Sequence, residues 1–149
     1  MELTAKDIMT KDVITIKEDN SIYDAIETLI SLNINCLPVL NNEGILTGIV
    51  TETDLVYVDK KLNESSYYAY SKLHVPIDSR NLNKNSNRFK DLTIKDVMTK
   101  KPRTVKEDTS LDKIIDIIIN KGLKTIPVVK DSKVIGIITR KNILKYYLK

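Results

Sequence analysis

The sequence predicts an α/β fold of the α+β kind, built from two copies of one small β-α-β-β-α unit. Two observations lead to this prediction: a motif that returns later in the chain, and the same order of strand-like and helix-like patterns after each occurrence. Residues 6–11 read Lys-Asp-Ile-Met-Thr-Lys, and residues 95–100 read Lys-Asp-Val-Met-Thr-Lys. A unit of about 55 residues buries too little apolar surface to be stable alone. We therefore expect the two copies to pack on each other.

Each copy begins with a short β segment, predicted at 13–16 and at 104–105. A polar cluster at 19–21 or 108–110 supplies a helix N-cap. Apolar residues then recur at the spacing of an amphipathic helix. These residues are Ile22, Ala25, Ile26 and Leu29 in the first copy, and Leu111, Ile114, Ile115 and Ile118 in the second. Asn33 and Gly122 stand where each helix should end.

Two apolar strands follow in each copy, joined by a polar turn as a hairpin. We predict them at 36–40 and 45–50, and at 125–129 and 134–138. A last helix should begin near Thr53 or Arg140. The predicted organisation is a first repeat at 1–62, a linker or insert at 63–91 and a second repeat at 92–149.

Composition excludes several classes of protein. The chain has 149 residues, 42% of them hydrophobic and 30% charged, with one cysteine and one histidine. An internal disulfide framework is therefore excluded and a structural zinc site is disfavoured. The start lacks the features of a signal peptide and no run is long enough to span a membrane, so we expect a cytoplasmic protein without a membrane partner. Residues 1–60 carry a net charge of −7 and residues 61–149 a net charge of +11. This asymmetry indicates either two halves that attract each other or a nucleic-acid face.

The repeated motifs resemble those of the cystathionine-β-synthase (CBS) domain family, in the tandem arrangement called a Bateman module. The resemblance covers nearly all the chain outside 63–91, and three segments in each copy carry it. They are 7–10, 38–39 and 48–55 in the first copy, and 96–99, 127–128 and 136–143 in the second. The resemblance implies two repeats that pack through their sheets and are related by a pseudo-twofold axis. It also implies two clefts between the repeats, which take an adenosine-containing ligand such as AMP, ADP, ATP or S-adenosylmethionine. It also implies a homodimer, and a regulatory role without catalysis or a cofactor.

By family position, Asp54 is the residue expected to receive the two ribose hydroxyls, and Thr51 to reach a ribose or phosphate oxygen. One ionised carboxylate can accept both hydrogen bonds of a diol. Asp54 equally suits the first turn of a helix, where a carboxylate is favourable without any ligand. The same cleft is expected to be lined by two further segments. They are Thr10, Lys11, Asp12, Val13 and Ile14, and Asn35, Cys36, Leu37 and Pro38.

The second copy departs from the family pattern because Asn142 stands where the acid is expected. An uncharged amide makes a weaker acceptor, so the second cleft is not an equal site. Thr139, the counterpart of Thr51, stands three residues before Asn142. Arg140, followed by Lys141, offers donors suited to phosphate oxygens in a shared cleft. An exposed basic helix start explains the same residues without a ligand. The second-copy counterparts of the lining segments are Arg103, Lys124, Thr125, Ile126 and Pro127.

The leading hypothesis is therefore a sensor of adenine nucleotides that acts on an unknown regulated partner. The alternative is a structural or nucleic-acid interaction module whose clefts are vestigial, motivated by the basic second half and by Asn142. An enzyme is not expected, because the sequence contains no convincing set of catalytic residues. Cys36 is the only cysteine, and the only histidine, His74, lies in the linker, whereas a catalytic cysteine needs a basic neighbour. The tyrosines at 67, 68 and 70 fit either base stacking or packing of the linker.

Overall fold

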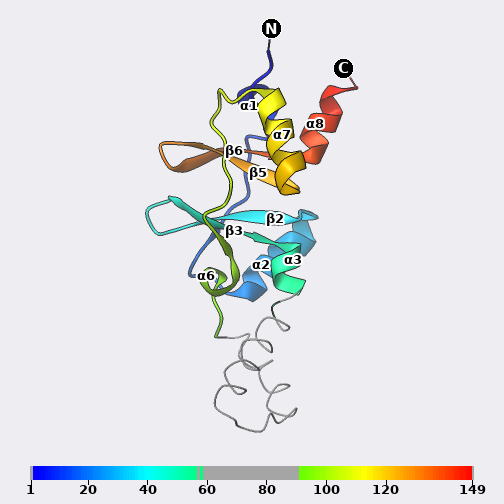
Figure 1. Ribbon diagram of the computed structural model, residues 1–149. Helices are drawn as coiled ribbons and strands as arrows, with labels where there is room; N and C mark the ends of the chain where they lie inside the picture. Colours follow the sequence, from blue (N-terminus) through cyan, green and yellow to red (C-terminus); the bar gives the residue numbers. More distant parts are fainter. Residues whose placement is uncertain (1, 57, 59–90, 149) are drawn as a thin grey trace, which may run out of the picture.

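The computed structural model describes residues 2–56, 58 and 91–148. Two α/β units face each other through their sheets, and the longer helices lie on the outer sides (Figure 1). The strands carry apolar side chains inward, which explains why they form the middle of the molecule. The predicted linker beyond residue 58 and before residue 91, including His74 and the three tyrosines, lies outside the described residues. The predicted repeat boundaries at 62 and 92 stay a prediction.

The first repeat has the predicted order of elements. β1 (Ile16–Lys17) pairs in parallel with β2 (Cys36–Leu40), and β2 pairs antiparallel with β3 (Leu46–Thr51). Between β1 and β2 the chain forms α2 (Ile22–Leu32). Its N-cap is Ser21, whose hydroxyl accepts from the Asp24 backbone N–H at 3.2 Å. The helix ends at Asn33, in the left-handed conformation with φ 52°. α3 (Glu52–Val56) follows β3 directly.

The second repeat follows the same plan. α7 (Leu111–Lys121) is capped by the Ser110 hydroxyl and ends at Gly122, with φ 62°. β5 (Thr125–Lys130) and β6 (Lys133–Thr139) form an antiparallel hairpin that runs straight into α8 (Arg140–Tyr146). A register shift falls between Val39 and Leu40 in β2 and at the matching place in β5. The duplication therefore extends to a detail of the strand pairing.

The opening strands were predicted imperfectly. β1 covers Ile16–Lys17 rather than 13–16, because only this part pairs with β2. Its counterpart in the second repeat is reduced to a single parallel bridge between Val105 and Val128. The hairpin strands and last helices begin within one residue of the predicted positions. Ile26, predicted on the buried face of α2, is exposed.

The sequence analysis predicted no helix or strand in the segment that opens each repeat. α1 (Ala5–Ile8) and α6 (Ile94–Val97) are single helical turns, and β4 (Thr99–Lys100) follows α6. We call residues 3–10 the first arm and residues 92–100 the second arm. Each arm crosses to the opposite repeat, since Ala5 N–H donates to the Thr109 carbonyl at 2.8 Å and Ile94 N–H donates to the Asn20 carbonyl at 2.9 Å.

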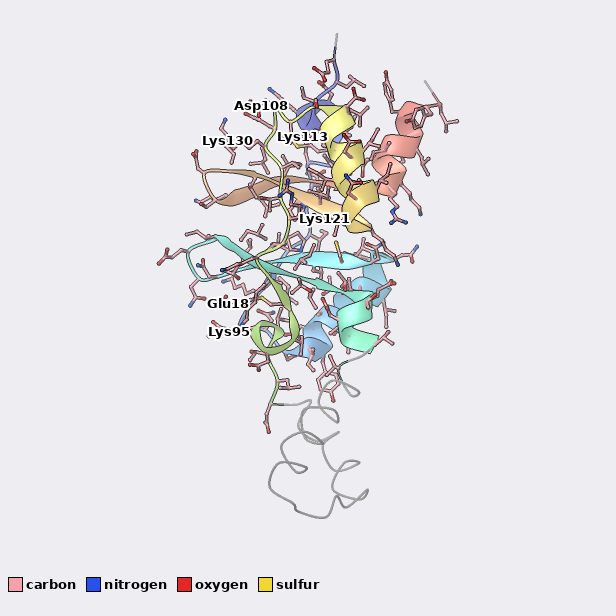
Figure 2. All side chains as sticks on the ribbon, viewed as in Figure 1. Glu18, Lys95, Asp108, Lys113, Lys121 and Lys130 are labelled. Atoms are coloured by element: carbon pink, nitrogen blue, oxygen red, sulfur yellow. The ribbon has the colours of Figure 1, made fainter. Side chains whose placement is uncertain are left out.

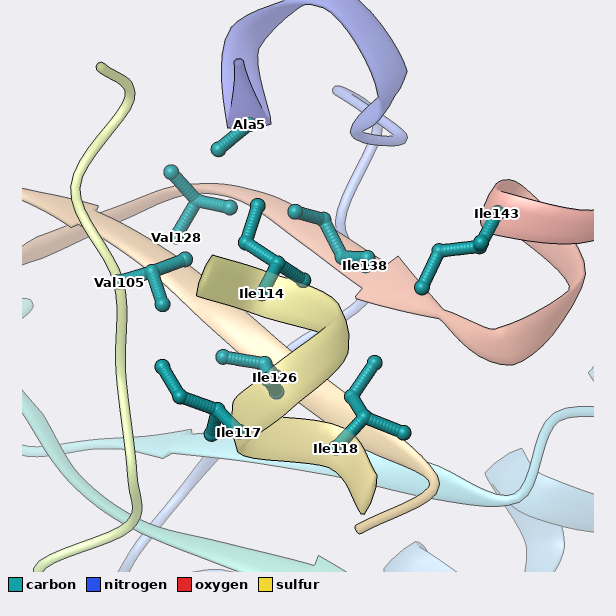
Figure 3. Packing of buried hydrophobic residues seen from close by; sticks show 9 residues of the cluster. All are labelled: Ala5, Val105, Ile114, Ile117, Ile118, Ile126, Val128, Ile138 and Ile143. Carbon is teal, nitrogen blue, oxygen red and sulfur yellow. The ribbon is translucent and has the colours of Figure 1, made fainter. Parts of the chain in front are cut away.

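The exchanged arms complete both sheets and both cores. β4 of the second arm is the outer strand of the order β1-β2-β3-β4, and Thr10 of the first arm bridges Ile137 of β6. In Figure 2, Glu18 and Lys95 lie together where the second arm crosses, and Lys95 N–H donates to the Glu18 carbonyl at 3.0 Å. In Figure 3, Ala5 points from the first arm into the core of the second repeat. Ile94 is buried in the core of the first repeat in the same way.

Candidate functional site

A cavity of about 570 Å³ lies between the repeats and is lined by both of them. The first repeat supplies Thr10, Asp12, Val13, Ile14, Asn33, Ile34, Asn35, Cys36 and Glu52. The second repeat supplies Lys124, Ile137, Thr139, Arg140, Lys141, Asn142 and Lys145. The volume is in the range that takes a drug-sized or nucleotide-sized molecule, which is about 300–1,000 Å³.

The crossing of the first arm explains how these elements meet. Thr10 is held on β6 by reciprocal backbone bonds with Ile137, at 2.9 and 3.0 Å. The chain that leaves the arm, residues 12–14, therefore passes beside the start of α8 before it returns to its own repeat. Asn35 and Cys36 at the start of β2 close the other side, where Glu52 N–H donates to the Asn35 carbonyl at 3.0 Å.

The structure groups the predicted residues differently from the sequence analysis. The predicted residues that line this cavity are Thr10, Asp12, Val13, Ile14, Asn35, Cys36, Lys124, Thr139, Arg140 and Asn142. The predicted residues that do not line it are Lys11, Leu37, Pro38, Thr51, Asp54, Arg103, Thr125, Ile126 and Pro127. Asp54, which we expected to share a cleft with residues 10–14, does not line this cavity, and its place in a ligand site stays a prediction. The arm carries those residues to Asn142 instead, and only the tertiary structure reveals that crossing.

Several lining residues were missed. Lys145 follows Lys141 by four residues, so helical spacing on the predicted last helix was a signal that both face one side. Lys141 was considered only as the neighbour of Arg140. Asn33, Ile34, Glu52 and Ile137 are ordinary cap, strand-flank and strand residues, and nothing in their local pattern distinguishes them.

Cations outnumber anions around the cavity. Lys124, Arg140, Lys141 and Lys145 come from the second repeat, and Asp12 and Glu52 come from the first. The Arg140 Nε–H donates to the Leu123 carbonyl at 3.0 Å, which anchors the guanidinium beside the cavity. This arrangement suits a ligand with at least one anionic group, because guanidinium and ammonium groups donate strong, charge-assisted hydrogen bonds.

Asp54 is a buried capping residue, only 7% exposed. Its carboxylate accepts from the Thr51 backbone N–H at 3.1 Å, and the Thr51 hydroxyl accepts from the Asp54 N–H at 3.2 Å. The hydroxyl of Thr99, from the second arm, lies 3.4 Å from both carboxylate oxygens. These contacts give Asp54 a structural role at the start of α3. Its expected contact with a ribose stays a prediction.

Asn142 occupies the matching position at the start of α8 and makes bonds in both repeats. Its Oδ1 accepts from the Thr139 N–H at 2.9 Å and from the Thr139 hydroxyl at 2.7 Å. Its Nδ2 donates to the Ile8 carbonyl at 2.9 Å and to the Thr10 hydroxyl at 3.0 Å. The amide therefore joins α8 to the first arm.

Cys36 lines the cavity but is itself buried. Burial raises the pKa of its thiol. A thiol held in its neutral form is a poor nucleophile. Among the described residues, no cluster of His, Cys, Asp or Glu is arranged to hold a metal ion, and no helix is long and apolar enough to cross a membrane.

An α/β unit that occurs twice, exchanges its arms and encloses a cavity between its copies defines a paired-repeat module. The family model of the CBS domain matches residues 5–61 and 94–149, so the chain belongs to the CBS domain family. The inosine-5'-monophosphate dehydrogenase of Methanocaldococcus jannaschii is 29% identical over 95% of this chain, and the chain spans 23% of that protein.

Two solved structures have the same fold over almost their whole length. The crystal structure of CBSX2 of Arabidopsis thaliana in complex with AMP is 27% identical, with a TM-score of 0.75, and the match covers 98% of this chain and 96% of that one. The CBS domain pair of protein MJ0100, in complex with 5'-methylthioadenosine and S-adenosyl-L-methionine, is 28% identical, with a TM-score of 0.70. That match covers 99% of this chain and 97% of the other. The predicted fold class and the predicted family are thereby confirmed.

Proposed function

We propose that this chain is a regulatory module that binds an adenosine-containing ligand in the cavity between its repeats and catalyses no reaction. The observation that carries the proposal is the cavity itself, which is nucleotide-sized and bordered by an excess of cations. The relatives support it, because CBSX2 is described with AMP and MJ0100 with two adenosyl compounds. A bound ligand would favour one relative orientation of the repeats, and so change the surface offered to a regulated protein.

The charge around the cavity favours an anionic ligand over a neutral nucleoside. Lys141 and Lys145 lie one turn apart on α8, and Lys124 and Arg140 are close to them. Among the expected ligands, AMP, ADP and ATP carry phosphate, whereas S-adenosylmethionine does not. We therefore expect affinity to rise from adenosine to AMP, by about tenfold for each strong charge-assisted contact that is gained.

Isothermal titration of ligand-free protein with adenosine, AMP, ADP, ATP and S-adenosylmethionine tests the proposal. Lys141→Ala should weaken AMP by about tenfold and leave adenosine unchanged, because only the phosphate gains from the ammonium group. Lys113→Ala, an exposed lysine on α7 that does not line the cavity, is the matched control. Absence of binding for every ligand would overturn the proposal. Equal loss of AMP and adenosine would overturn the placement of the phosphate beside Lys141.

A homodimer remains part of this proposal. Exposed apolar residues recur at equivalent positions of the outer helices: Ile30 at 76% and Ile119 at 70%, and Val56 at 73% and Leu144 at 61%. A second copy would offer the same repeated apolar face, which suits a twofold interface. Sedimentation velocity should then give a dimer that Ile30→Asp converts to a monomer. A monomer for the unchanged chain would contradict this part.

The cytoplasmic location, the existence of a regulated protein partner and the nucleic-acid alternative stay predictions. Part of the positive charge that motivated a nucleic-acid face surrounds the cavity, on Lys124, Arg140, Lys141 and Lys145. Those side chains therefore suit a small anionic ligand.

A further inference from the structure

The Asn142 side chain uses its whole hydrogen-bonding capacity within the protein. An amide oxygen accepts two hydrogen bonds and an amide NH₂ group donates two. Both acceptor positions are taken by Thr139, at 2.9 and 2.7 Å, and both donors go to Ile8 and Thr10, at 2.9 and 3.0 Å. The amide lines the cavity, but a ligand hydroxyl that bonded to it would have to displace one of these partners.

We propose that Asn142 is a positioning residue that locks the first arm onto α8 and so fixes the wall of the cavity. It is then no weakened substitute for the acid found at position 54. Its two donors are what the position requires, because the Ile8 carbonyl can only accept. A carboxylate in the same place would turn an acceptor toward an acceptor and lose that bond. The part of this inference that concerns ligands rests on the proposed function.

The Asn142 amide also helps to form the wall of the cavity. Asn142 and Lys145 also line a second cavity of about 330 Å³, together with Leu3, Asp7, Ile8 and Tyr146. The amide and the arm therefore stand between the two cavities. Release of the arm would remove the wall that Thr10 provides, so ligand binding and arm closure are thermodynamically coupled.

Amide hydrogen exchange of the ligand-free chain tests the lock directly. The backbone N–H groups of Ala5, Lys6 and Thr10 donate to carbonyls of the second repeat, so their exchange reports release of the first arm. Asn142→Asp keeps the size of the side chain and an acceptor for the Thr139 cap, and replaces the two donors by a charged acceptor oxygen that faces the Ile8 carbonyl. We expect exchange at those three amides to rise by about tenfold, as for the loss of one to two hydrogen bonds.

Internal and matched controls separate the lock from general instability. Ile94 and Lys95, whose N–H groups tie the second arm to the first repeat, should exchange at an unchanged rate in Asn142→Asp. Asp54→Asn is the reciprocal change at the equivalent position and should leave Ala5, Lys6 and Thr10 unaffected. If Asn142→Asp does not fold, Thr10→Val removes one partner of the amide and should raise exchange of the first arm by roughly threefold. Unchanged exchange of the first arm in the variant would overturn the inference.

Adenosine binding tests the consequence for the site without the complication of a charged phosphate. The lock predicts that Asn142→Asp weakens adenosine by several-fold, because the wall is less often closed. Tighter binding would show that residue 142 contacts the ribose directly, and would overturn the inference. If adenosine and AMP bind neither protein, the proposed function fails, while the exchange experiment still decides the lock.

Discussion

The two helix starts at Asp54 and Asn142 are equivalent by duplication but differ in how they hold the repeats together. Both residues cap their helix through a threonine three residues earlier, Thr51 or Thr139. Both also face a threonine of the opposite arm. Asn142 donates to Thr10 at 3.0 Å and to a carbonyl at 2.9 Å, whereas the Thr99 hydroxyl lies 3.4 Å from the Asp54 carboxylate.

This difference shows that one scaffold position can serve two purposes. The cap needs only an acceptor, so aspartate and asparagine both satisfy it. The contact with the opposite arm depends on whether the side chain can also donate. A charged carboxylate only accepts hydrogen bonds, for example from a hydroxyl, whereas an amide can also donate one to a backbone carbonyl.

The largest effect is expected from the core that the second arm completes. Ile94→Ala should lower the free energy of unfolding by about 3 kcal/mol, because it leaves a cavity in the buried core of the first repeat. Chemical denaturation measures this value. Ala5→Gly in the first arm removes a single methyl group and should cost about 1 kcal/mol. An equal decrease in the free energy of unfolding for Ile94→Ala and Ala5→Gly would contradict this prediction.

Gly48 in β3 and Gly136 in β6 allow an arm to pass close to the backbone of each strand. A Cβ at Gly48 would overlap the Met98 side chain and approach the Thr99 carbonyl, whereas at Gly136 its three nearest atoms would all belong to the Met9 side chain. Gly48→Ala should therefore cost about 2–3 kcal/mol and Gly136→Ala about 1–2 kcal/mol, since a flexible methionine moves more easily than backbone. Thermal unfolding of the two variants gives the comparison. The reverse order would contradict it.

Double-mutant cycles compare the two cross-repeat contacts themselves. We expect a coupling energy of about 1 kcal/mol between Thr10 and Asn142, and about 0.5 kcal/mol or less between Thr99 and Asp54, because the second contact is longer. Each cycle needs the two single alanine variants and the double variant, measured by urea denaturation. A larger coupling at Asp54 would reverse our interpretation of the pair.

The smallest effect concerns Cys36, whose equivalent in the second repeat is Thr125. Burial raises the pKa of the thiol in the folded state. The associated stability is present below the pKa of the unfolded thiol, about 8.5, and is lost as the pH rises through the higher folded value. Relative to Cys36→Ala, the unchanged chain should therefore lose stability as the pH rises above about 8.5. Parallel pH curves for the two proteins would contradict this prediction.

Local features of the sequence, namely helix caps and apolar patterns, predicted the fold. Ser21 and Ser110 act as N-caps, Asn33 and Gly122 end their helices, and the hairpin strands follow the apolar runs. The arms could not be predicted, because a single helical turn such as Ala5–Ile8 has no periodicity of its own. For the same reason, the sequence did not indicate that Thr10, Asp12, Val13 and Ile14 line a cavity together with Asn142 of the other repeat.

The sequence by itself determined the duplicated unit, the family, most element boundaries and the basic character of the last helix. These depend on neighbours within a few residues, and local propensity and patterning encode them directly. Only the tertiary structure decided that the arms cross, that the cavity joins residues 10–14 to Asn142, and that the amide holds the two together. Those outcomes depend on contacts between residues 45 to 134 positions apart, and no local pattern specifies which partner a crossing segment will meet.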